Sequence, residues 1–196
     1  YLSAPVPDPS DRAALMNLML AQRLDTVPGA RYGYSSPGYT ILAGIVEQVS
    51  GERYEHYVQR RLLDRAGLTA TRFIGTRSTL TGADAVLHSY TDDRDEGPIT
   101  AFPSPGFDFG AGDIITTAPD LHKWVAAVRN GVVMPREFAD QLFAPSVPTG
   151  AGTTSSGFGW NIITLATGQP LITHGGDLGD YNAEYRYYPA DSLTIV

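Results

Sequence analysis

Apolar positions at helical spacing dominate the first third of the chain. They predict a helix over residues 11 to about 24, capped by Ser10. A second helix is predicted to begin at Ser36 as its N-cap and to end at Gly51, and a third covers residues 53–63. The second helix carries an apolar stripe formed by Ile41, Leu42, Ile45, Val46 and Val49.

The middle of the chain changes character. Residues 73–109 are rich in Gly, Pro, Thr and Asp, and we expect a long loop-rich excursion with short strands that borders a binding cleft. Thr117 and Asp120 then form a capping box ahead of a helix that stops at Asn130-Gly131. A shorter helix is predicted over 135–143.

Beyond Pro148 the pattern is that of strands. Because the chain stops inside the last apolar run, we expect an incomplete sheet. The predicted strands cover 157–165, 171–174, 181–188 and 192–196.

Charge and composition exclude several classes of protein. The 21 acidic residues outnumber the 14 basic ones, for a net charge of −7, which argues against a nucleic-acid partner. No apolar run approaches ~18 residues, so no membrane span is expected. The chain has no cysteine, which excludes thiolate catalysis and cysteine zinc sites. Absence of cysteine fits an exported protein, so a periplasmic or secreted location is favoured over a cytoplasmic one.

We expect neither a metal nor a cofactor. The acidic run over 92–96 lacks the calcium-loop pattern and is predicted to be a solvated loop. No phosphate loop or dinucleotide fingerprint is present. No metal-ligand spacing relates the four histidines, which are His56, His88, His122 and His174.

The first candidate for chemistry is Tyr34-Ser35-Ser36, at a loop-to-helix junction where side chains project into a cleft. Nearby cations can lower the pKa of a tyrosine from its ordinary ~10 and make it a proton acceptor. The alternative is a half-buried aromatic beside a helix cap. A further alternative makes Ser35 the nucleophile of an α/β-hydrolase, although Pro37 stands where the G-x-S-x-G elbow needs glycine.

The second candidate is His174-Gly175-Gly176, which follows a short apolar strand. Two glycines allow a substrate backbone to approach a sheet edge closely, and a histidine can supply a proton or a hydrogen bond near neutral pH. The alternative is a tight turn with a hydrogen-bonded histidine.

Together these segments resemble the serine β-lactamase superfamily, in its branch of class C β-lactamases, D-Ala-D-Ala carboxypeptidases and related esterases. The likeness lies in the Tyr-Ser-Ser-Pro-Gly-Tyr stretch and following helices (32–71), the Thr-Thr-Ala-Pro-Asp-Leu stretch (111–121) and the strand-rich end (157–196). It implies an α+β fold of the β-lactamase and DD-peptidase type, with an antiparallel sheet flanked by helices plus a mostly helical region. The chain would be a single incomplete domain over 1–196, with helices and loops in 1–148 and sheet strands in 149–196.

The resemblance also implies residue roles. Tyr34 would be the catalytic tyrosine, and Ser36 replaces the usual Asn. His174 stands where β-lactamases carry the Lys of Lys-Thr-Gly. A histidine at this position is more typical of the peptidase and esterase members. Gly175 replaces the Thr that often contacts a carboxylate, and the backbone N–H of Asp177 would supply half of an oxyanion hole. Gly176 completes the substrate-binding set.

One family motif is absent. The nucleophile of the family sits in Ser-x-x-Lys, whereas Lys123 is the only lysine here and Asp120 precedes it by three positions. We therefore expect a serine hydrolase that cleaves esters or amides through an acyl-enzyme, with esterase or D-peptidase activity ranked above strong β-lactamase activity and with this chain alone inactive. The alternative is a non-catalytic homologue that binds a peptide or glycan. The expected partners are a small-molecule or peptide substrate and an oligomer or second polypeptide that completes the sheet.

Overall fold

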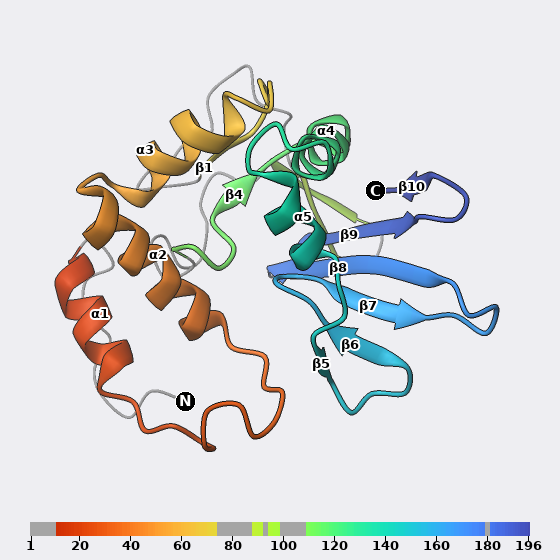
Figure 1. Ribbon diagram of the computed structural model, residues 1–196. Helices are drawn as coiled ribbons and strands as arrows, with labels where there is room; N and C mark the ends of the chain where they lie inside the picture. Colours follow the sequence, from red (N-terminus) through yellow and green to blue (C-terminus); the bar gives the residue numbers. More distant parts are fainter. Residues whose placement is uncertain (1–10, 74–87, 92–93, 99–108, 179–180) are drawn as a thin grey trace. The chain divides into compact units, whose positions relative to one another are not determined.

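The computed structural model describes residues 11–73, 88–91, 94–98, 109–178 and 181–196 (Figure 1). The chain divides into two compact units. We call unit one the segments Tyr1–Asp25, Ser35–Asp64 and Ala70–Thr117, and unit two the segments Thr26–Tyr34, Arg65–Thr69 and Ala118–Val196.

Unit one consists of helices and short strand pairs. Its helices are α1 (Arg12–Leu20), α2 (Ser36–Ser50), α3 (Tyr54–Val58) and the π-helical turn η1 (Gln59–Leu63) that continues α3. Its two antiparallel strand pairs are β1 (Arg72–Phe73) with β4 (Ile114–Ile115), and β2 (His88–Thr91) with β3 (Arg94–Pro98).

The three predicted N-terminal helices are present, with corrected ends. Helix α1 begins after Asp11, whose carboxylate accepts the Ala14 N–H at 2.9 Å, so Asp11 and not Ser10 is its N-cap. The helix ends at Leu20 rather than near Leu24, because Leu24 is 69% exposed and has little packing to hold another turn. Gly51 ends α2 as predicted, in the left-handed conformation at φ 70°.

Helix α2 buries a different face from the one that its apolar stripe predicts. Its buried side chains are Thr40 and Ala43, whereas Leu42, Ile45 and Val49 are exposed. Part of the predicted apolar stripe therefore lies on the surface of unit one.

At two glycines of unit one, a neighbouring side chain lies where a Cβ would be. A Cβ on Gly44 of α2 would lie 2.6 Å from the end of the Met16 side chain of α1, which would have to shift. Gly110 has φ +72°, and a Cβ there would lie 2.5 Å from Ala43 Cβ.

A cluster of charged and aromatic side chains holds α1 to the start of α3. The Arg12 guanidinium forms an ion pair with Glu55 and lies 3.4 Å from the centre of the Phe109 ring. Glu47 of α2 accepts the Tyr54 N–H at 2.9 Å, and Tyr54 meets Phe109 edge to face at 5.3 Å between ring centres. Burial, with smaller contributions from nearby carboxylates, raises the pKa of Tyr54 to about 12.

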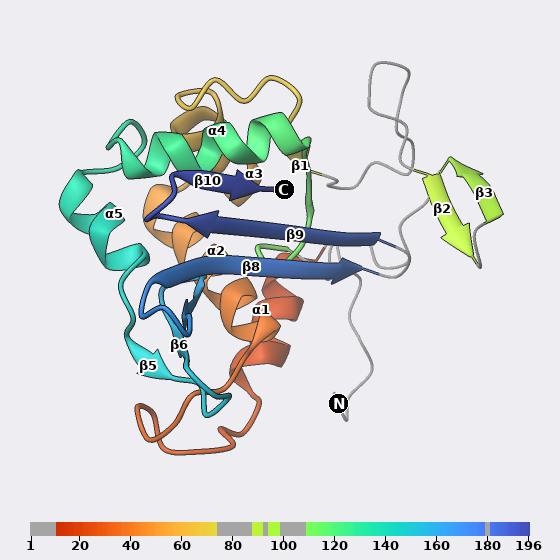
Figure 2. The ribbon, with the colours of Figure 1, turned by 90° about the vertical axis from the view of Figure 1, so that its right-hand side faces the viewer.

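Unit two is a six-stranded antiparallel sheet with two helices (Figures 1 and 2). The helices are α4 (Ala118–Arg129) and α5 (Arg136–Leu142). The strand order is β10-β9-β8-β7-β6-β5, with bounds β5 (Val147–Pro148), β6 (Thr154–Ser156), β7 (Asn161–Thr164), β8 (Pro170–Leu178), β9 (Tyr181–Tyr188) and β10 (Leu193–Ile195).

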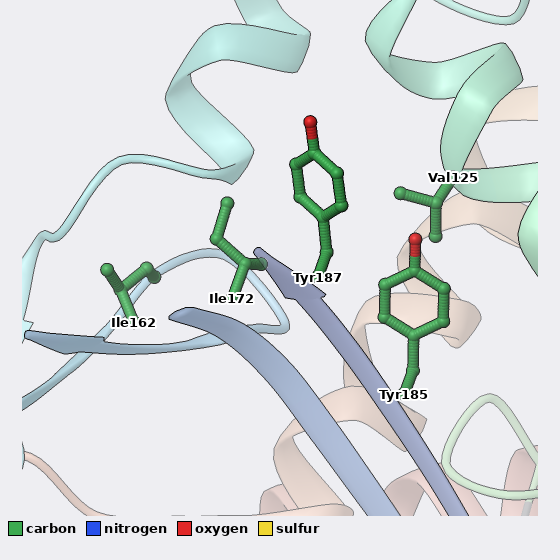
Figure 3. Close-up of a cluster of buried hydrophobic side chains, with 5 residues drawn as sticks. All are labelled: Val125, Ile162, Ile172, Tyr185 and Tyr187. Atoms are coloured by element: carbon green, nitrogen blue, oxygen red, sulfur yellow. The ribbon is translucent and has the colours of Figure 1, made fainter. Parts of the chain in front are cut away.

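The core of unit two lies between one face of the sheet and α4. Four buried strand residues project from that face, and the buried Val125 of α4 meets them (Figure 3). Leu121, Trp124, Phe143 and Trp160 pack around this cluster. The four strand residues are Ile162, Ile172, Tyr185 and Tyr187.

The predicted strands are present, and their lengths differ from the prediction. Strand β9 has the predicted bounds, whereas β8 continues past His174 through both glycines to Leu178. The sequence did not predict β5 or β6. Within the acidic run, residues 94–96 belong to β3 and not to a loop, and residues 92–93 lie outside the described part of the chain.

Candidate active site

A hollow of about 390 Å³ opens on the hairpin formed by β8 and β9 in unit two. Its volume falls in the range of small-molecule sites. Three of the residues that line it, Gly175, Gly176 and Asp177, are the substrate-binding residues that the sequence predicts on β8. The other three come from β9 and are Asn182, Ala183 and Glu184.

The register of the hairpin explains part of this lining. Gly175 pairs with Glu184, and Asp177 pairs with Asn182. Paired residues of an antiparallel sheet share a face, so these four residues lie on one face of the hairpin. The core residue Tyr185 lies on the opposite face, because successive side chains alternate along a strand.

One edge of β8 is open beside the hollow. Strand β7 pairs with β8 only from Pro170 to Thr173. Beyond Thr173, no other strand of the described chain pairs with β8 on that side, while β9 continues to pair with it on the other. An open strand edge offers backbone N–H and C=O groups to an extended ligand.

Glu184 is the charged residue whose environment is best defined in the hollow. Its Oε1 accepts hydrogen bonds from Thr173 Oγ1 at 2.8 Å and from Arg186 Nε at 3.1 Å. The Thr173 hydrogen bond and then the Arg186 hydrogen bond lower the pKa of Glu184, with a smaller contribution from His174. Glu184 is therefore ionised at neutral pH.

His174 borders the hollow without lining it. It is half-buried, it precedes Gly175 on β8, and it pairs with Tyr185 across the hairpin. By register it lies on the face of the sheet opposite Glu184. His174 and the two glycines therefore belong to one extended strand, which corrects the alternative of a tight turn.

Tyr34 and Ser36 lie where the chain enters α2, and neither lines the hollow. The Tyr34 side chain is 68% exposed, so it is not the half-buried aromatic of the alternative interpretation. Ser35, not Ser36, is the N-cap of α2, because Ser35 Oγ accepts the Gly38 N–H at 3.0 Å. Ser36 is the first residue of the helix, and it is exposed.

The α/β-hydrolase alternative is wrong. The nucleophile elbow follows a strand of an α/β-hydrolase sheet. Here Ser35 caps a helix and no strand precedes it among residues 11–35, and the six-stranded sheet of unit two is antiparallel throughout.

The sole lysine has a structural partner. Lys123 Nζ lies 3.1 Å from the carboxylate of Asp120, which is buried in the first turn of α4. Within the part of the chain that the structure describes, no three His, Asp or Glu side chains gather as metal ligands would. No helix in that part is long and apolar enough to cross a membrane.

Sequence reasoning missed Asn182, Ala183 and Glu184. The alternation of residues 181–188 predicts the strand, but only the register with β8 places Glu184 opposite Gly175. The paired strands β8 and β9 run side by side in Figure 2.

Comparisons with known proteins agree with this fold. The Beta-lactamase family model matches residues 1–196. The penicillin-binding protein PbpX of Bacillus subtilis is 29% identical over 124 residues, which cover 63% of this chain and 31% of that protein. The chain thus spans about a third of the length of this relative.

Two solved structures share the fold. A D-stereospecific amidohydrolase from Streptomyces sp. superposes with a TM-score of 0.76 at 20% identity, covering 93% of this chain and 54% of that one. An octameric penicillin-binding protein homologue from Pyrococcus abyssi superposes with a TM-score of 0.69 at 24% identity, covering 86% of this chain and 38% of that one. Because the Beta-lactamase family model matches the chain along its whole length, the chain belongs to the Beta-lactamase family.

Proposed function

We propose that this chain is the substrate-facing part of a serine hydrolase that cleaves esters or amides through an acyl-enzyme. The supporting observation is the open edge of β8, where Gly175 and Gly176 border a hollow of small-molecule size. Amide substrates are supported by the likeness in fold to a D-stereospecific amidohydrolase. We rank esterase or D-peptidase activity above strong β-lactamase activity, because His174 stands in place of the lysine of Lys-Thr-Gly.

In this proposal the substrate lies extended along β8, and its backbone pairs with the strand beyond Thr173. The backbone N–H of Asp177 donates to the carbonyl oxygen as negative charge develops there. Tyr34 accepts the proton of the attacking serine and returns it to the leaving group. His174 donates a hydrogen bond to the substrate, and Ser36 contributes a hydroxyl in place of an amide.

The attacking serine lies outside residues 1–196 in this proposal. The family carries it in Ser-x-x-Lys, and residues 1–196 contain no such motif, since Lys123 follows Asp120 by three positions and forms an ion pair with it. Residues 1–196 alone are therefore expected to form no acyl-enzyme.

Replacing Tyr34 tests the proposal in the full-length protein. Tyr34→Phe removes the hydroxyl that transfers the proton and keeps the ring. We expect kcat for p-nitrophenyl butyrate to fall about 10²–10⁴-fold, the usual contribution of general acid–base catalysis. Tyr32→Phe makes the same chemical change two residues away and should stay within about twofold. Equal turnover by Tyr34→Phe and the wild-type protein would remove Tyr34 from the mechanism.

A second candidate function is that of a non-catalytic homologue that binds a peptide or glycan. It is favoured by the two departures from the family motifs, Ser36 for Asn and Gly175 for Thr. Saturable binding of a peptide by the full-length protein, without turnover and without a covalent adduct, would select this function over the first.

Two further features remain proposals. We propose a periplasmic or secreted location. We also propose that an oligomer or a second polypeptide covers surface that this chain leaves open, and the octameric relative from Pyrococcus abyssi favours the oligomer.

A further inference from the structure

Glu184 occupies the space above Gly175. A Cβ built on Gly175 would lie 2.9 Å from Glu184 Oε2, closer than Cβ atoms approach other heavy atoms. Gly175 lies within β8, and its φ is outside the left-handed range, so its backbone would accept a side chain. The carboxylate of Glu184, and not backbone strain, is what a side chain at position 175 would meet.

The Glu184 carboxylate is held in this place from one side. Thr173 Oγ1 and Arg186 Nε both donate to Oε1, so the other oxygen, Oε2, is the one directed to Gly175. Thr173 is buried, which fixes that donor. The two hydrogen bonds therefore restrain a negative charge at the strand where we propose that the substrate lies.

The charge of the hollow follows from its lining. Glu184 and Asp177 are its acidic residues, and none of its six lining residues is basic. Arg186 offsets part of the Glu184 charge, but it binds from outside the lining through Oε1. A substrate carboxylate at Gly175 would meet Oε2 at close range and be repelled, whereas an ammonium group there would gain an ion pair.

We infer that Glu184 is a specificity-determining residue that directs the site to substrates with a free ammonium group, such as amino-acid amides or esters, and against substrates with a carboxylate at that position. The inference rests on the proposed hydrolase function of the same site. It also bears on glycine at position 175: the Cβ of a threonine there would lie 2.9 Å from Glu184 Oε2, so the Glu184 carboxylate would have to shift from its place beside the strand.

Paired substrates test this in the full-length protein. The ammonium substrate is D-phenylalanine p-nitroanilide, and the carboxylate substrate is its N-succinyl derivative. We expect the wild-type protein to have the higher kcat/KM for the ammonium substrate. Glu184→Gln should lower the ratio of the two kcat/KM values about threefold, because Glu184 is exposed and solvent screens its charge. Glu184→Lys should lower it about tenfold.

Glu137→Gln is the matched control. It removes an equal charge from an exposed position of α5 in the same unit, and it should leave the ratio unchanged. A ratio that Glu184→Gln leaves unchanged, or that Glu137→Gln lowers equally, would overturn the inference.

A double-mutant cycle tests the steric part. Gly175→Thr alone should weaken turnover of both substrates, because the new side chain meets Glu184 Oε2. Glu184→Ala in the Gly175→Thr background should restore turnover of the succinyl substrate above that of Gly175→Thr alone. Equal effects of Gly175→Thr with and without Glu184 would contradict the geometry.

Binding separates failure of the inference from failure of the proposed function. If the wild-type protein turns over neither substrate, calorimetry with D-phenylalaninamide and 3-phenylpropionate reports the same preference for charge. If the wild-type protein binds D-phenylalaninamide more tightly than 3-phenylpropionate, and Glu184→Gln reduces this preference, the role of Glu184 is supported while hydrolysis is refuted. Turnover with an unchanged ratio would refute the role of Glu184 alone.

Discussion

Asp113 is a carboxyl group held inside unit one, where it is 8% exposed. Burial, and to a smaller extent repulsion by Glu55, raises its pKa from 3.8 to about 6. Backbone hydrogen bonds from Asp113 itself and Gly110, and attraction by Arg12, offset only part of this. The folded protein therefore holds a proton on Asp113 at pH values where the unfolded chain has lost it.

The sign of the pH dependence follows from this difference. Below about pH 4 both states are protonated at Asp113, and between about pH 4 and 6 only the folded state is. The folded state thus binds more protons in that window, and the contribution of Asp113 to the free energy of unfolding falls as the pH rises through it. Above pH 6 the loss is complete and constant.

Asp113→Asn should remove this loss. At pH 7 we expect the variant to be more stable than the wild-type protein by up to about 3 kcal/mol, and at pH 4 the two should be close. Urea unfolding at both values checks this, with Asp140→Asn on the exposed surface of α5 as the control. A stability difference that is the same at pH 4 and pH 7 would contradict the burial argument.

Arg12 and Glu55 show the opposite case. Burial opposes ionisation of Glu55, but its own backbone hydrogen bond and then the Arg12 guanidinium outweigh burial and lower its pKa. Glu55 is therefore charged and paired in the folded protein, whereas burial raises the pKa of Asp113 in the same unit to about 6.

Among the helices, α2 begins directly after the loop that carries Tyr34. Ser35 caps the helix through the Gly38 N–H, and Ser36 is already helical. Ser35 is therefore the single residue between Tyr34 and the first helical residue.

Ser35→Ala should cost about 1 kcal/mol of stability, because one backbone N–H in the first turn of α2 loses its acceptor. Ser36→Ala, at an exposed helical position, should cost only a few tenths of a kcal/mol. Thermal unfolding of the two variants side by side makes the comparison. The reverse order would show that Ser36, as the sequence first predicts, is the cap.

The helices were predictable because their signals are local. Apolar spacing, Gly51 and Asn130-Gly131 each act within one or two turns, so α2 and α4 end where the sequence indicates. Strand β8 was predicted too short, since glycine argues against a strand, whereas pairing with β9 carries the strand through Gly175 and Gly176. Strands β5 and β6 have two and three residues and offer too little alternation to detect.

The residues of the candidate site also fall into those that the sequence predicts and those that it does not. The family resemblance predicts Gly175, Gly176 and Asp177 as site residues, because these adjacent residues carry its motif, and all three line the hollow. Glu184 could not be predicted, because its place depends on the hairpin register and on hydrogen bonds from Thr173 and Arg186. The motif thus predicts the glycines of β8, and the register of the hairpin places Glu184 opposite Gly175.

At the scale of the whole molecule, an exposed apolar face on α2 bears on the partners of the chain. Leu42, Ile45 and Val49 lie at helical spacing and are all half-exposed or more. Exposed apolar side chains at helical spacing form a surface that a further polypeptide can cover. It favours the proposed oligomer or second polypeptide.

In the proposed function, residues 1–196 handle the substrate and its protons, and the nucleophile lies outside residues 1–196. The most direct test is to trap the acyl-enzyme of the full-length protein with a slowly hydrolysed ester, or with a fluorophosphonate, and to locate the adduct by peptide mass spectrometry. We expect one adduct, on a serine that is followed three residues later by lysine and that lies outside residues 1–196. An adduct on Ser35, Ser36 or any other serine within residues 1–196 would contradict it.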